Sequence, residues 1–160
     1  MSLTIRAARP GEAPLVLQFV RELAEYEKLS HEVSATESML DAVLFCANPR
    51  VFCEFAEWDG AAVGFAVWLF DYSTFNGRFG IYLEDLFVRP ALRGRGIGKA
   101  MMAHLARRCA AHGAPHLQWS VLDWNTPSID FYKSLGAVLK DEWTICHLGG
   151  EALTRLADRA

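Results

Sequence analysis

The sequence lacks a hydrophobic run long enough to cross a bilayer, which requires about 20 apolar residues. The longest such run, residues 61–70, is much shorter, and the start MSLTIRAARP has no apolar signal-peptide core. Cysteine is scarce and unpatterned, with no CxxC pair or other metal-ligand spacing among Cys46, Cys53, Cys109 and Cys146. We therefore expect a soluble, cytoplasmic protein without a membrane partner, whose reduced cysteines are buried as small hydrophobic residues.

The sequence also lacks an excess of positive charge. The net charge of −3 and the pI near 5.9 argue against a dedicated nucleic-acid binder, which would carry a basic face. The five histidines show no ligand spacing, so we expect neither a metal site nor a catalytic histidine among His31, His104, His112, His116 and His147. With 52% hydrophobic and 22% charged residues, a chain of 160 residues can bury a substantial core, and we expect a single domain over residues 1–160.

Strands and helices follow from residue periodicity and turn signals. The predicted strands are Leu3–Ala7, Val51–Trp58, Ala61–Phe70, Gly80–Val88, Leu117–Leu122 and Trp143–Leu148. The predicted helices span residues 11–28, 34–45, 97–112, 126–135 and 151–157. A capping box at residues 34–37 would begin the second helix, Thr126 would cap the fourth, and Asp59-Gly60 predicts a two-residue hairpin turn. This order predicts a mixed α/β or α+β sandwich.

A glycine-rich stretch, RGRGIGKA at residues 93–100, follows the strand that ends at Val88. It is not a P-loop, because Arg93 stands where the first glycine is required and Ala100 stands where serine or threonine is required. It is not a dinucleotide-binding loop either, since no third glycine follows Gly98 at the required spacing.

The remaining pattern is Arg93-x-x-Gly96-x-Gly98 between a strand and the start of a helix. Glycine permits positive φ and close approach of a ligand, so successive N–H groups can surround a phosphate at the positive end of the helix. Arg93, Arg95 and Lys99 would supply counter-charge. The alternative is a tight strand-to-helix turn with solvated arginines.

This pattern resembles the acetyl-CoA diphosphate loop of the GNAT superfamily of N-acetyltransferases. The resemblance extends to its diamine acetyltransferase branch, which includes the thialysine N-epsilon-acetyltransferases. It is carried by YLEDLFV (82–88), RGRGIGKA (93–100), VLDWNTPSIDFYKSLGA (121–137), YSTF (72–75) and GEALTRLA (150–157). It implies the GNAT fold, an α/β (α+β) architecture whose mixed, mostly antiparallel central sheet of about seven strands is flanked by helices on both faces.

The resemblance also implies acetyl-CoA as co-substrate and no metal. The residues it assigns to cofactor binding are Leu86, Phe87, Val88, Arg93, Gly94, Arg95, Gly96, Ile97, Gly98, Lys99, Asn125, Ser128 and Tyr132. Backbone groups between Leu86 and Val88 would pair with the pantetheine arm as an added strand and stabilise the oxyanion.

Two residues are assigned to catalysis. Glu84 resembles the glutamate that takes the proton of the amine, through water, and Tyr132 resembles the tyrosine that returns a proton to the sulfur of CoA. Without the family context, Glu84 reads as a surface carboxylate paired with an arginine. Tyr132 reads as a core or rim residue of a helix.

The residues assigned to the amine are Tyr26, Glu27, Glu84, Asp85 and Trp143. In a regular strand, consecutive side chains face opposite sides, so Glu84 and Asp85 share a cleft only if a bulge intervenes. Asp85 would either neutralise a cationic substrate or cap a turn. The stretch Tyr72-Ser73-Thr74-Phe75 lacks the Asp-Pro-Trp element of the polyamine enzymes, and favours a smaller amine with an amino-acid head, such as thialysine, lysine or ornithine.

The sequence thus predicts an enzyme, an acetyl-CoA-dependent N-acetyltransferase. It would act on a primary amine of a small molecule, by direct attack in a ternary complex. The branch implies a homodimer. Two alternatives remain open: a CoA-binding sensor that has lost turnover, and a protein or peptide N-acetyltransferase.

Overall fold

A computed structural model describes residues 1–159, which form two compact units, one spanning Met1–Trp124 and a second beginning at Asn125. The first unit contains the strands β1 (Leu3–Ala7), β2 (Val51–Trp58), β3 (Ala61–Ser73), β4 (Arg78–Val88) and β5 (Leu117–Gln118). Its helices are α1 (Ala13–Tyr26), α2 (Glu37–Leu44) and α3 (Ile97–His112), with single 3-10 turns at Ser30–Glu32 and Pro90–Leu92. The second unit contains α4 (Thr126–Ser134) and α5 (Gly150–Ala157).

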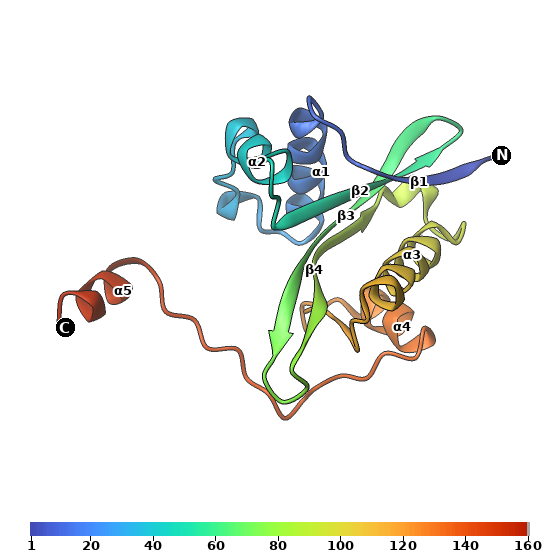
Figure 1. The fold of residues 1–160 in the computed structure, drawn as a ribbon. Coiled ribbons are helices and arrows are strands. Elements are labelled where there is room, and N and C mark those ends of the chain that lie inside the picture. The colour runs from blue at the N-terminus through green and yellow to red at the C-terminus, as the bar shows by residue number, and fades with distance from the viewer. Residues whose placement is uncertain (160) are drawn as a thin grey trace. The chain divides into compact units, whose positions relative to one another are not determined.

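The sheet follows chain order, β1-β2-β3-β4-β5. The first four strands are antiparallel, and β5 joins β4 in parallel. In the first unit, α1 and α2 cover one face of the sheet and α3 covers the other (Figure 1). The predicted mixed, mostly antiparallel sheet with helices on both faces is confirmed, but the prediction of about seven strands is wrong, because the described residues form five.

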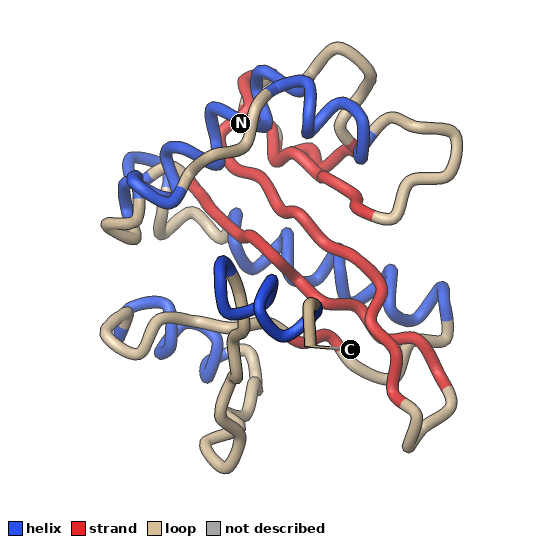
Figure 2. The backbone as a smooth tube through the Cα atoms, turned by 90° about the vertical axis from the view of Figure 1, so that its left-hand side faces the viewer, coloured by secondary structure: helices blue, strands red, loops and turns tan. Residues whose placement is uncertain are grey.

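The turn between β2 and β3 forms as its sequence predicts. Asp59 and Gly60 have φ values of 50° and 82°, the left-handed pair that a two-residue hairpin of this twist requires. The hairpin between β3 and β4 is longer, and Figure 2 shows these two strands running side by side to their connecting turn.

Each face of the sheet packs on a helix whose apolar residues recur at helical spacing. Between α1 and the sheet, the buried side chains are Val16, Phe19, Leu23, Phe55, Phe65, Val67 and Phe87, among others. On α3, Ile97, Met101, Leu105 and Cys109 recur every four residues and are all buried. Gly113, with φ of 63°, ends this helix as expected. These two packed layers hold β4 rigidly between them, and β4 carries the predicted site.

Several local predictions are wrong in detail. Thr36, rather than Ser34, caps α2 by accepting a hydrogen bond from Met39 N (3.2 Å). Asn125, rather than Thr126, caps α4 by accepting from Ser128 N (3.4 Å). In both cases several polar residues in a row can cap a helix, and the path of the incoming chain selects one of them.

The cysteines differ in their exposure to solvent. All four are free, and Cys53 and Cys109 are buried as predicted. Cys46 and Cys146 are exposed, so the prediction that the cysteines lie in the core is wrong for these two.

The predicted strand Trp143–Leu148 is not formed, and the predicted strand Leu117–Leu122 is reduced to Leu117–Gln118. A strand exists only where a neighbouring strand pairs with it, and within residues 1–159 no ladder includes residues 143–148. Its Trp143 side chain is 76% exposed.

Candidate active site

A β-bulge interrupts β4 at Glu84. Leu83 lies opposite Trp68 and Asp85 lies opposite Val67, so Glu84 is the extra residue between two adjacent pairs. In a regular strand, residues 83 and 85 would share a face, but the inserted residue turns Asp85 to the face of Val67. The bulge therefore directs Asp85 toward the side of the sheet that α1 covers.

Three carboxylates interact at this point, and we call Glu27, Glu84 and Asp85 the acidic cluster. Burial, followed by the negative charges of Glu84 and Glu27, raises the pKa of Asp85 to about 7. Burial also raises the pKa of Glu27, the residue that follows the last residue of α1. Asp85 is half-buried and Glu84 is exposed, so the cluster extends from the sheet interior to solvent.

Aromatic side chains lie beside the acidic cluster. The ring of Tyr26 is centred 6.4 Å from that of Phe87 and 6.3 Å from that of Trp124, and the Lys28 ammonium lies 5.0 Å from the centre of the Trp124 ring. Trp124 is a site residue that the sequence analysis missed. Its only sequence signal is its position beside Asn125 in a segment that carries the family resemblance.

The Arg93 side chain belongs to this aromatic wall. Its guanidinium carbon lies 4.4 Å from the centre of the Tyr26 ring and 5.5 Å from that of Phe87. Its Nε donates a hydrogen bond to the Val88 carbonyl (2.9 Å). Arg93 was expected to supply counter-charge for a phosphate; in the structure its side chain joins the glycine loop to the end of β4 and to α1.

One edge of β4 is unpaired beyond the bulge. Within the described chain, β5 pairs with β4 only at Ile81 and Tyr82. The Arg89 N–H donates to Val63 O on β3 (2.9 Å). Because main-chain groups of successive residues point to alternate edges, those of Leu86 and Val88 point to the edge that β5 leaves open, where the Val88 carbonyl already accepts from Arg93 Nε. An extended ligand could add to this edge as another strand.

The glycine loop leads into the first turn of α3. Gly94 and Gly96 have φ values of 75° and 79°, which side-chain-bearing residues adopt at a cost. The first helical hydrogen bond of the loop runs from Ala100 N to Gly96 O (2.9 Å), so the N–H groups of residues 97–99 precede it at the positive end of the helix. Lys99 is exposed, and the Arg95 guanidinium carbon lies 5.7 Å from the centre of the Trp58 ring.

The remaining predicted residues belong to the second unit. Asn125 is buried and holds the first turn of α4 through Ser128. Tyr132 lies further along α4, where its ring is centred 5.2 Å from that of Phe131. The structure thus brings Tyr26, Glu27, Glu84 and Asp85 together in the first unit, and Asn125 and Ser128 together in the second.

No three His, Cys, Asp or Glu side chains of residues 1–159 gather in a way that could hold a metal ion. None of the helices in that range combines the length and the apolar character needed to cross a membrane.

Comparison with known proteins identifies the family of this chain. Residues 20–137 match the acetyltransferase (GNAT) family. Thialysine N-epsilon-acetyltransferase of Bos taurus is 40% identical over 97% of this chain and 97% of its own length, and that of Sus scrofa is 38% identical over 99% of each. An integron cassette protein from V. cholerae has a structure that superposes with a TM-score of 0.80 at 30% identity, covering 98% of each chain. The chain therefore belongs to the acetyltransferase (GNAT) family, in the branch of the thialysine N-epsilon-acetyltransferases, and is an N-acetyltransferase.

Proposed function

We propose that this enzyme transfers the acetyl group of acetyl-CoA to a primary amine of a small molecule, by direct attack in a ternary complex. The substrate class is thialysine, a lysine-like amino acid or a diamine, as the names of the similar enzymes suggest. The observation that carries this proposal is the acidic cluster beside the unpaired edge of β4.

The acidic cluster suits a cationic substrate. Burial and, after it, the negative charges of Glu84 and Glu27 raise the pKa of Asp85, and an ammonium group placed among the three carboxylates relieves their mutual repulsion. The faces of Tyr26 and Trp124 add attraction between a cation and aromatic rings. A neutral or anionic acceptor would gain neither effect.

Proton transfer is then assigned to two side chains. An alkyl ammonium has a pKa near ~10.4, so it must lose a proton before its nitrogen can attack. Glu84, which is exposed at the bulge, accepts this proton through a water molecule. Asp85 neutralises the positive charge that remains on a substrate with a second cationic group. The amine nitrogen then attacks the acetyl carbon, and as the N–C bond forms and the C–S bond breaks, the nitrogen loses its excess proton to water while Tyr132 donates its phenolic proton to the leaving sulfur. The assignment of Trp143 to the amine rests on the family resemblance alone.

Main-chain groups are assigned to acetyl-CoA. N–H groups of residues 94–99, with Arg95 and Lys99, hold the diphosphate at the start of α3. The open edge at Leu86–Val88 pairs with the pantetheine arm and supplies the N–H that stabilises the oxyanion. The family resemblance assigns Asn125 and Ser128 to the same arm, and with it a single catalytic domain over residues 1–160.

We further propose a cytoplasmic homodimer. Apolar side chains of the second unit are open to solvent, with Val138 81%, Trp143 76% and Ile145 80% exposed. These three residues lie within eight positions of the sequence, and a concentration of exposed apolar residues is usually covered by another protein surface. A second copy of the chain is the partner that the family resemblance implies.

A thiol-release assay tests the function. The purified enzyme is incubated with acetyl-CoA and, in turn, thialysine, lysine, ornithine, putrescine and spermidine, and free CoA thiol is measured. We expect amine-dependent release, highest with the amino-acid amines. Absence of release with every primary amine, together with retained acetyl-CoA binding, would support the sensor alternative instead. Release only with a lysine-containing peptide would support the peptide acetyltransferase.

A further inference from the structure

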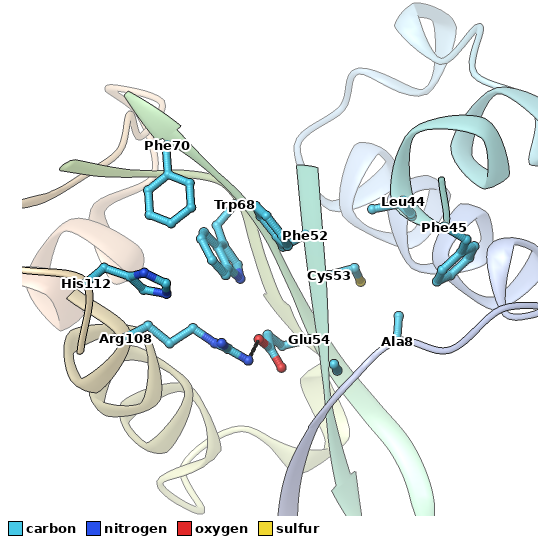
Figure 3. A pocket seen from close by; sticks show the side chains of 11 residues that line it. Ala8, Leu44, Phe45, Phe52, Cys53, Glu54, Trp68, Phe70, Arg108 and His112 are labelled. Atoms are coloured by element: carbon cyan, nitrogen blue, oxygen red, sulfur yellow. Dashed lines mark ion pairs between the residues drawn. The ribbon is translucent and has the colours of Figure 1, made fainter. Parts of the chain in front are cut away.

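A cavity of about 270 Å³ lies at the edge of the first unit where β1 ends. We call it the β2 cavity, and its principal lining residues are Phe52, Glu54, Trp68, Phe70, Arg108 and His112. In Figure 3, Arg108 and His112 of α3 lie on one side of it, and Leu44 of α2 and the residue after it, Phe45, lie on the other. Neither the acidic cluster nor the glycine loop contributes a lining residue.

The walls of the β2 cavity are mainly aromatic. Phe52 stacks on Trp68 with ring centres 4.3 Å apart, and Phe70 meets both rings edge-on. His112 in turn meets Phe70 edge-on at 5.1 Å. A cavity of this volume is several times the roughly 30 Å³ that one water molecule occupies, so it has room for a small organic group.

Two polar groups on these walls lack hydrogen-bond partners. Glu54 and Trp68 are each 2% exposed, and within the described residues neither Glu54 Oε2 nor Trp68 Nε1 has a hydrogen-bond partner. His104 Nε2 lies 3.5 Å from Glu54 Oε2, a contact that becomes ionic only when the ring is protonated. One buried acceptor and one buried donor therefore stand at the same cavity, and each costs free energy until it is paired.

The local charge decides which ligand can pair them. Arg108 Nη2 contacts Glu54 Oε1 at 2.5 Å, and the Arg108 guanidinium lies 5.4 Å from the centre of the Trp68 ring. The Glu54 carboxylate is therefore already compensated. An ammonium ligand would leave one positive charge in excess at a buried site, and an anionic ligand would face the carboxylate. A neutral group with one donor and one acceptor satisfies both walls without adding charge.

We propose that the β2 cavity binds the acetamide group of an N-acetylated amine, the product class of this enzyme. The amide N–H donates to Glu54 Oε2, the amide carbonyl accepts from Trp68 Nε1, and the methyl group packs against the aromatic wall. The Arg108 side chain, which is 34% exposed, shifts its position to admit the ligand while it remains paired with Glu54. The choice of this ligand depends on the proposed function, because acetyl transfer converts an ammonium, which the cavity rejects, into the amide that it accepts.

The test uses N-butylacetamide as probe and butylammonium as its matched unacetylated control. Each is titrated into the ¹⁵N-labelled full-length enzyme, and the indole N–H signal of Trp68 is followed, assigned by its loss in Trp68→Phe. We expect a saturable shift with the amide and none with butylammonium at equal concentration. No shift with the amide, or equal shifts with both probes, would overturn the proposal.

Two variants separate the site from nonspecific effects. Trp68→Phe keeps an aromatic ring at this position and removes the Nε1–H donor. It should weaken amide binding several-fold, as measured by calorimetry. Ala8→Leu fills the cavity and should abolish binding even if Trp68→Phe does not fold. Phe75→Ala, at a fully exposed position, serves as control. Unchanged affinity in both cavity variants, or a soaked crystal with only water between Glu54 and Trp68, would refute the site.

Thiol release by the wild-type enzyme, measured on the same preparation, distinguishes the two proposals. Turnover without a Trp68 shift refutes the amide site and leaves the proposed function standing. A Trp68 shift without turnover on any amine refutes the proposed function and shows that the site binds amides independently of it.

Discussion

Glu84 and Asp85 are consecutive residues of β4, yet only Asp85 has a partner on β3, because Glu84 is the extra residue of a bulge. This relationship places one carboxylate in solvent and half-buries the other, and their mutual repulsion helps to raise the pKa of Asp85 to about 7. Two adjacent acids thereby acquire different properties, one suited to exchange a proton with water and one suited to hold a cation.

Glu84→Gln should lower kcat by about 10²-fold or more, because it removes the proposed proton acceptor while preserving the shape of the side chain. The dissociation constant of acetyl-CoA should stay within a few-fold of wild type. Steady-state kinetics and calorimetry measure the two quantities. Glu37→Gln, an exposed change on α2, is the matched control. Wild-type kcat in Glu84→Gln would exclude this residue as the base.

Asp85→Asn should stabilise the protein, and more so at pH 8 than at pH 4. The pKa of Asp85 is about 7 in the folded protein and 3.8 ordinarily, so the folded state binds this proton more tightly than the unfolded state. The stability contributed by the protonated group is complete below pH 4 and is lost as the pH rises through 7. We expect a gain of about 2 kcal/mol at pH 8, after allowance for partial exposure.

Urea unfolding at the two pH values measures this effect. A gain that is equal at pH 4 and pH 8 would show that the burial of an ionised Asp85 is not its cause. The same substitution should raise the amine KM above pH 7, where the wild-type carboxylate is charged, and should change it little at pH 6.

The two arginines of the glycine loop should differ in effect. Arg95→Ala should weaken acetyl-CoA binding several-fold and spare kcat at saturation, because it removes only counter-charge. Arg93→Met should raise the KM of both substrates, because it breaks the bond to Val88 O and the stacking on Tyr26. Unchanged acetyl-CoA affinity in Arg95→Ala would contradict the assignment of Arg95 to the diphosphate. An unchanged KM for the amine in Arg93→Met would contradict the role of Arg93 in joining the glycine loop to β4 and α1.

Tyr132→Phe should lower turnover while acetyl-CoA affinity remains within a few-fold of wild type, because it removes only the proposed proton donor. The loss should be smaller with an acyl donor whose leaving thiol is more acidic, since that thiol needs less protonation. Pre-steady-state kinetics with both donors checks this. An equal loss with the two donors would indicate that Tyr132 acts by packing.

Gly80→Ala should destabilise the protein by about 2–4 kcal/mol, because a Cβ there would overlap the His116 ring and the Asp71 carboxylate. His116 Nε2 lies 2.9 Å from Asp71 Oδ1, so the ring cannot move without breaking that contact. The cost of Gly80→Ala should shrink in a His116→Ala background, which removes the ring. Gly60→Ala is the comparison, since its Cβ would meet no atom and would cost only the ~1 kcal/mol of its positive φ.

Sequence alone located the features that depend on near neighbours in the chain. The apolar residues of α3 recur every four positions, and the Asp59-Gly60 turn needs only the conformational preferences of two residues. The sequence also located the glycine loop at the start of α3. Gly96, the residue before this helix, has positive φ, which glycine permits, and it has no side chain that could cap the helix. The acids at positions 84 and 85 could be named as candidates, but their orientations could not be assigned.

Only the tertiary structure decided which residues meet across the fold. The bulge at Glu84 depends on the register between β3 and β4, the direction of Arg93 depends on the arrival of Tyr26 from α1, and the Glu54–Arg108 pair joins β2 to α3. Likewise, residues 143–148 have strand-like composition but remain unpaired within the described chain. The periodicity of apolar residues indicates which face of a segment can be buried. The pairing of strands, the burial of charge and the pKa of Asp85 depend instead on partners distant in sequence, which the local pattern does not specify.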